Sequence, residues 1–277
     1  PFFLRRPLRR RPPVFPLPRP LLFLQPIRVN NLMESFPIPA PAFNGNSRVV
    51  PPGNAFDWLR QGWALFAANP GLWIGLTIVL LVIVLGVQIV PLVGTLAAHL
   101  LMPVLGAGLL LVCRKIDEGE SVQIDDLFAG FKQNAGPLVM VGVLYMLAML
   151  AIVVIVIAVG GGSVAGGLLS AQPAGLGVIF GGLMLSLLLS LALSVPVVMA
   201  IWFAPALVFF NNMQPVEALK ASFEACMKNV LAFLVYGLIV LVLAFFAALP
   251  VGLGFLVLIP VLAGSVYAAY RDVFVAN

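Results

Sequence analysis

Residues 72–90 read LWIGLTIVLLVIVLGVQIV, a run of 19 residues without a charged side chain. After Pro91, residues 92–113 read LVGTLAAHLLMPVLGAGLLLVC, again without Asp, Glu, Lys or Arg. A bilayer core about 30 Å thick is crossed by roughly 20 helical residues, so each run is long enough to span a membrane once. The proline between the two runs predicts a tight turn, and hence a helical hairpin.

Four further stretches of similar length and composition bring the expected number of spans to six. These stretches are 138–159, 183–210, 230–249 and 251–270. A second tight turn is expected at Pro250. The Gly-rich run 160–182 is expected to be an extracytoplasmic loop, because glycine disfavours a regular helix; whether part of it re-enters the membrane is left open.

The composition of the whole chain also indicates a membrane protein. Hydrophobic residues make up 62% of the 277 residues and charged residues only 9%, whereas soluble domains carry roughly 25% charged residues. The mean hydropathy is +1.13. A surface so poor in charge is not stable in water. The fold class is therefore predicted to be an all-α polytopic membrane protein, and its main partner is expected to be the lipid bilayer.

The distribution of charge predicts the orientation in the membrane. Every one of the 15 Lys and Arg and 10 Asp and Glu residues lies before the first span, between spans two and three, between spans four and five, or after span six. By the positive-inside rule this side is cytoplasmic, which places both termini in the cytoplasm. The net charge of +5 is therefore interpreted as a topology signal, and no nucleic-acid partner is expected.

The first 54 residues differ from the rest of the chain. Residues 1–54 are rich in proline and arginine, and we expect a disordered tail. Residues 1–32 are interpreted as a segment outside the natural protein, with Met33 as its start. Residues 55–277 form the predicted six-helix transmembrane domain. Its two cysteines, Cys113 and Cys226, are expected to be reduced thiols at cytoplasmic helix ends.

A similar motif precedes spans one, three and five. The three copies are DWLRQGW (57–63), DDLFAGF (125–131) and EALKASF (217–223), followed by Asn69, Asn134 and Asn229. The shared pattern of acid, Leu, small residue and aromatic residue places the last three on one helix face. It predicts an interfacial amphipathic helix before each hairpin, in three copies related by an axis along the membrane normal. The alternative is that any apolar hairpin needs an amphipathic segment before it.

Few side chains in the spans could support chemistry. The spans contain no Asp, Glu, Lys or Arg, which argues against a pump or an ion-coupled transporter. His99 is interpreted as either a packed residue or a proton carrier. Ser186, Ser190 and Ser194 recur every four residues, which is typical of helix packing and is also compatible with a hydroxyl-lined path for a neutral solute. No catalytic residue, metal site or cofactor is expected.

Several segments between Phe56 and Phe274 resemble an uncharacterised family of proteobacterial six-helix inner-membrane proteins. The segments are Arg60-Gln61-Gly62-Trp63, Phe66 to Pro70, FAPALV at 203–208 and Tyr267 to Arg271. The layout is also distantly similar to the membrane domain fused to some glycerophosphodiester phosphodiesterases, whose soluble catalytic domain is missing here. The resemblance implies a bacterial inner (cell) membrane location and brings no activity with it.

Two functions follow as hypotheses. The first is a non-enzymatic protein that organises or assists other membrane components, with membrane-protein partners or a second copy of the chain. The alternative is a channel or transporter for a neutral or amphiphilic solute. A liposome flux assay discriminates between them.

Overall fold

The computed structural model describes residues 46–91, 93–170 and 174–275, and all regular structure within these residues is helical. Six stretches are long and apolar enough to cross a membrane, which confirms the predicted fold class. They are formed by α3 (Pro70–Val87), α4 (Val93–Asp117), α6 (Ala135–Leu169), α7 (Ala174–Trp202) with α8 (Ala204–Asn211), α10 (Val230–Ala248), and α11 (Phe255–Tyr270) with the π-helical turn η2 (Arg271–Val275).

Short helical segments precede three of these stretches. They are α2 (Asn54–Ala68), the 3-10 helix η1 (Ile124–Phe128) with α5 (Ala129–Lys132), and α9 (Pro215–Lys228). Between each short segment and the long helix after it stands one of the three asparagines of the sequence motif. Asn69 is the N-cap of α3, Asn134 that of α6 and Asn229 that of α10.

Each short segment packs against the second long helix of a different pair. α2 lies on α11, η1 and α5 lie on α4, and α9 lies on α7 and α8. The small residue of each motif sits at this contact. A Cβ on Gly62 would collide with the carbonyl oxygen of Val261, and a Cβ on Gly130 would collide with that of Val104. Val261 and Val104 each follow a proline inside the helix, so the two contacts are made at matching positions.

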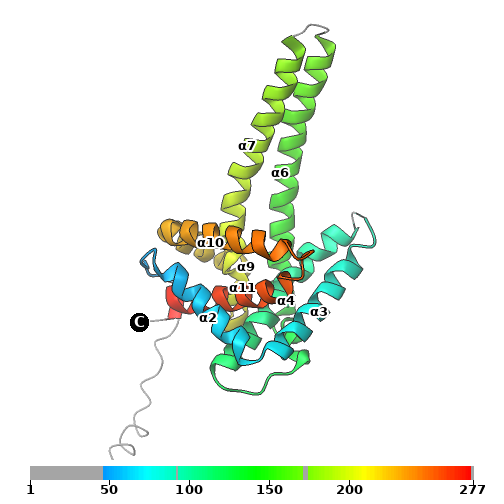
Figure 1. Cartoon of the computed structure of the whole chain (residues 1–277). Coiled ribbons are helices and arrows are strands. Elements are labelled where there is room, and N and C mark those ends of the chain that lie inside the picture. The colour runs from blue at the N-terminus through cyan, green and yellow to red at the C-terminus, as the bar shows by residue number, and fades with distance from the viewer. Residues whose placement is uncertain (1–45, 92, 171–173, 276–277) are drawn as a thin grey trace, which may run out of the picture. The chain divides into compact units, whose positions relative to one another are not determined.

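The Gly-rich run is helical, and the prediction of a loop over 160–182 was wrong. α6 continues without interruption to Leu169 and α7 begins at Ala174, with residues 171–173 outside the described part. Glycine is tolerated here because it lets the two helices approach closely. A Cβ on Gly160, for example, would lie 2.9 Å from Oγ of Ser186. Figure 1 shows α6 and α7 side by side, extending beyond the other labelled helices.

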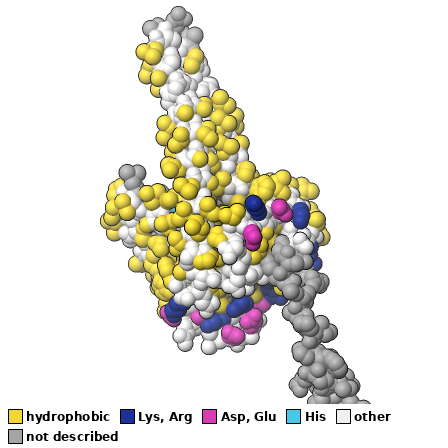
Figure 2. All heavy atoms as spheres, turned by 180° about the vertical axis from the view of Figure 1, so that it is seen from behind, with side chains coloured by type: hydrophobic (Ala, Val, Ile, Leu, Met, Phe, Trp, Pro, Cys, Tyr) yellow, Lys and Arg dark blue, Asp and Glu magenta, His cyan; other side chains and the backbone are white. Residues whose placement is uncertain are grey.

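The α6–α7 pair is longer than a bilayer core is thick. The 35 residues of α6 measure about 52 Å at 1.5 Å per residue, against a core of about 30 Å. In the most apolar stretches, only 17% of α6 and 6% of α7–α8 is buried within the chain. Figure 2 shows that this pair is covered by hydrophobic side chains, while the charged side chains visible on this face lie elsewhere.

The segment before α2 is packed against the helical domain. Arg48 N donates to the carbonyl of Val273 (2.9 Å) and Val50 N donates to Oδ1 of Asn229 (2.7 Å). This part of the predicted disordered tail is therefore ordered, and the helical unit begins before α2. The remainder of that prediction, residues 1–45, lies outside the described residues.

Candidate functional site

An open cavity of about 380 Å³ lies where α4, α6 and the α7–α8 junction meet. It is lined by Ala98, His99, Met102 and Pro103 from α4, by Tyr145 from α6, and by Ile201 and Pro205 from either side of the junction. Tyr145 lies about 15 Å along α6 from Ala135, at 1.5 Å per residue. The helices that carry His99 and Tyr145 are both long and apolar enough to cross a membrane.

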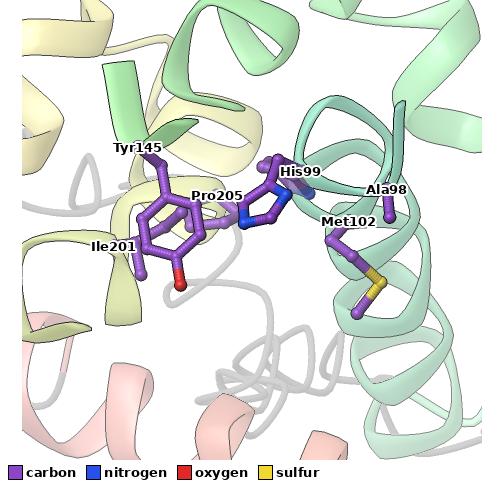
Figure 3. Close-up of a pocket in the computed structure, with 7 residues that line it drawn as sticks. Ala98, His99, Met102, Tyr145, Ile201 and Pro205 are labelled. Carbon is purple, nitrogen blue, oxygen red and sulfur yellow. The ribbon is translucent and has the colours of Figure 1, made fainter. Parts of the chain in front are cut away.

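The two polar side chains of the cavity lie against each other. The rings of His99 and Tyr145 are stacked with their centroids 5.4 Å apart and their planes inclined by 29°. Nδ1 of His99 is 2.6 Å from the carbonyl oxygen of Thr95, one turn earlier in α4. Figure 3 shows the two rings side by side, with Ala98 and Met102 on the α4 side. This contact fixes the orientation of the imidazole.

A proline and a glycine position His99. Pro103 has no N–H, so the carbonyl of His99 loses its helical partner four residues later. That carbonyl lies against α6 at Gly142, where a Cβ would be only 2.6 Å from it. The two helices therefore meet backbone to backbone beside the cavity, and Tyr145 follows Gly142 by one turn of α6.

The α7–α8 junction has its own structural cause. In an unbroken helix, the amide of Phe203 would donate to the carbonyl of Met199. Here the hydroxyl of Ser222, on α9, accepts from Phe203 N (2.9 Å) and donates to Met199 O (2.7 Å). A side chain inserted into the helical hydrogen bonds bends a helix. Pro205 contributes as well, because it has no N–H to donate to the carbonyl of Ile201. Ile201 and Pro205 lie on either side of this bend, and both line the cavity.

The three serines predicted as a solute path or a packing ridge lie elsewhere. Ser186 is buried and its hydroxyl donates to the carbonyl of Gly182 (2.8 Å). Ser194 donates to the carbonyl of Leu191 (3.0 Å), and Ser190 is half-buried. None of the three lines the His99 cavity. Of the predicted site residues, the structure thus places only His99 in it.

Sequence reasoning missed Tyr145, Ile201 and Pro205. Tyr145 could have been found, since it is a lone tyrosine within an otherwise apolar run, and polar groups in spans are where function is expected. Pro205 also carries a signal, because a proline within the predicted span 183–210 indicates a bend in the helix; Ile201 carries none. The bend also depends on Ser222, a residue from a distant part of the chain.

Outside the spans, charged groups join the segments at one end of the helices. Lys115 and Asp126 form an ion pair of 2.7 Å, which links α4 to η1. Burial opposes the ionised form of Asp126, but the backbone N–H of Gln123 and the Lys115 ammonium outweigh it and lower the pKa of this carboxyl group. Asp272 accepts hydrogen bonds from Asn54 and Trp58, each at 2.8 Å. No group of three or more potential metal ligands occurs among the described residues.

Comparison with known proteins finds a relative that is a membrane protein. The chain is 33% identical over 221 residues to a probable inner membrane protein of Burkholderia thailandensis, covering 77% of this chain and 80% of that protein. No protein-family model matches the chain. No solved structure shows significant similarity to it. None of these comparisons supports the distant similarity to the phosphodiesterase membrane domain.

Proposed function

The chain belongs to the family of this probable inner membrane protein, and from that premise we propose that it binds a neutral or amphiphilic solute inside the bilayer and assists its passage without altering it chemically. The observation that carries this proposal is the cavity of about 380 Å³, which lies between helices long and apolar enough to cross a membrane. Its volume falls in the range of about 300–1,000 Å³ typical of small-molecule sites.

The lining supports an uncharged ligand. Five of the seven described lining residues are apolar, and none of the seven is Asp, Glu, Lys or Arg. A charged ligand brought into the membrane without a partner would have a large desolvation cost. An amphiphile already dissolved in the bilayer has an apolar part that can stay in lipid while its polar group enters the cavity.

A flux assay tests the proposed function. We would reconstitute the purified full chain in liposomes and follow the passage of a fluorescent alkyl glucoside from the inner to the outer leaflet. The expected result is passage several-fold faster than in protein-free liposomes, and slowed by Ala98→Trp, which fills the cavity. An unchanged rate, with or without the substitution, would contradict the proposal.

The second candidate function is the organisation of other membrane components. It is supported by the exposed α6–α7 pair, which buries only 17% and 6% of its most apolar stretches within the chain. Lipid or another membrane protein must cover that surface. Co-purification of a stoichiometric membrane-protein partner, together with an absence of flux, would favour this candidate over the first.

We also propose the orientation and the repeat that the sequence predicts. The ends that carry Lys115, Lys132, Lys228 and Arg271 would face the cytoplasm. The three units would be α2 to α4, η1 to α8 and α9 to η2, with the short segment of each packed on the second long helix of the preceding one. The contacts of Gly62, Gly130 and Ser222 support this cyclic arrangement.

A further inference from the structure

The hydrogen-bond contact of His99 restricts what the cavity can bind. A carbonyl oxygen only accepts hydrogen bonds, so the 2.6 Å contact with Thr95 places the hydrogen on Nδ1 of His99. A neutral imidazole has one donor nitrogen and one acceptor nitrogen. Nε2 is therefore left as an acceptor.

The hydroxyl of Tyr145 supplies the complementary group. A phenol can both donate and accept a hydrogen bond. The described residues give this hydroxyl no hydrogen-bond partner, and its ring is held in place by stacking on His99. The cavity thus presents one fixed acceptor and one free hydroxyl, and its remaining walls, including Met102 and Ile201, are apolar.

We propose that the ligand is a neutral amphiphile with a terminal hydroxyl group, such as a long-chain alcohol or an acylglycerol. Its O–H donates to Nε2 of His99, its oxygen atoms accept from the hydroxyl of Tyr145, and its hydrocarbon part lies against the apolar walls. A site built to hydrogen-bond a substrate hydroxyl discriminates strongly against an analogue that lacks it. This inference rests on the proposed function, because it specifies the ligand class of the same cavity.

A matched pair of probes tests the inference. The probes are hexadecanol bearing a photoactivatable diazirine in its chain and the methyl ether of the same alcohol, which keeps the chain and the oxygen but loses the O–H donor. Each is added to the full chain in lipid nanodiscs and irradiated, and the labelled peptides are identified by mass spectrometry. We expect the alcohol to label peptides that contain Met102 or Ile201 about tenfold more than the ether does.

Two variants keep the test specific. Tyr145→Phe removes only a hydroxyl group, from which the oxygen of either probe can accept, and should lower labelling by both probes. His99→Phe removes the acceptor and should lower labelling by the alcohol about tenfold while labelling by the ether stays as it was. Unchanged labelling by the ether also shows that the His99→Phe variant is folded. Ser194→Ala is the control, since its hydroxyl bonds within its own helix and lies outside the cavity.

The remaining outcomes separate the two proposals. Equal labelling by alcohol and ether, unaffected by Tyr145→Phe and His99→Phe, would overturn the hydroxyl inference and leave the cavity as a site for amphiphiles. An absence of cavity labelling by either probe would overturn the inference, and together with an unchanged rate in the flux assay it would overturn the proposed function as well.

Discussion

The hydroxyl of Ser222 takes the place of a helical hydrogen bond at Phe203. It accepts from the amide of Phe203 at 2.9 Å and donates to the carbonyl of Met199 at 2.7 Å. A single side chain of α9 thus satisfies both backbone groups at the point where α7 ends and α8 begins. Ser222 and Phe203 are both fully buried, so no water is at hand to replace the hydroxyl.

Replacing Ser222 by alanine should destabilise the protein by about 1–3 kcal/mol, because it leaves a buried amide without a partner. The bend between Ile201 and Pro205 should relax in part, since Pro205 still interrupts the helix, and this would alter the cavity. Thermal unfolding in detergent measures the first effect, and the labelling assay with the alcohol probe measures the second. Ser194→Ala is the matched control and should change neither; a Ser222→Ala protein as stable as the wild type would contradict the assigned role.

Two of the three motif asparagines, Asn229 and Asn69, should differ in importance although both are N-caps. Asn229 is 3% exposed and makes three bonds, to Val50 N, Arg48 O and Ala225 O. Asn69 is exposed and accepts one bond of 3.3 Å from Leu72 N. We expect Asn229→Ala to cost about 2–4 kcal/mol of unfolding free energy and Asn69→Ala about 0.5–1 kcal/mol. Denaturation of both variants side by side checks the order, and the reverse order would refute it.

The ion pair between Lys115 and Asp126 should make stability depend on pH in the acid range. The pKa of Asp126 is lowered from its ordinary value of 3.8, so its charged form stabilises the folded state above about pH 4. That contribution is lost as the pH falls through the lowered pKa. Asp126→Asn should therefore cost about 1 kcal/mol at neutral pH, and the difference from the wild type should shrink below about pH 4.

Asp125→Asn serves as the control for this pH dependence. Asp125 pairs with Lys132, but both side chains are more than half exposed, and exposed pairs contribute little. Unfolding curves of the three proteins between pH 3 and pH 7 provide the measurement. A penalty for Asp126→Asn that stayed constant across this range would show that the lost packing, and not the charge, matters.

Topology can be checked with reporter fusions at positions 120, 172 and 277. The proposed orientation predicts cytoplasmic, extracytoplasmic and cytoplasmic reporters in that order, because all charged connections share one side. Alkaline phosphatase and green fluorescent protein fusions at each position give opposite signals and control for each other. A cytoplasmic signal at 172 would mean that α6 and α7 do not cross the membrane together.

The sequence contains enough information for the spans and too little for the cavity. Hydropathy alone locates six stretches, since any apolar run of this length suits a bilayer. The prediction of a loop over 160–182 was wrong because helix propensities measured in water penalise glycine. In the structure, Gly160 faces Ser186 across a tight helix contact. The cavity could not be predicted, because it depends on α4, α6 and the bend at Phe203 meeting in space. His99 was visible from the sequence, but its neighbours were not.

The matching glycines Gly62 and Gly130 provide a test of the cyclic repeat. At each position a Cβ would collide with the carbonyl of the residue that follows a proline in the neighbouring long helix, Val261 for Gly62 and Val104 for Gly130. If the two contacts are equivalent, alanine at either position should cost a similar amount, about 1–3 kcal/mol, because the backbones must separate. Thermal unfolding of both single variants measures these costs.

Gly75→Ala is the control for this comparison, because a Cβ there meets nothing within 4 Å. This variant should be neutral or more stable by up to about 1 kcal/mol, as expected for alanine in place of glycine within a helix. Similar losses at Gly62 and Gly130, with none at Gly75, would support three units joined by the same contact. A loss at only one of the two glycines would mean that the motifs share a sequence pattern without sharing a structural role, and the repeat would have to be abandoned.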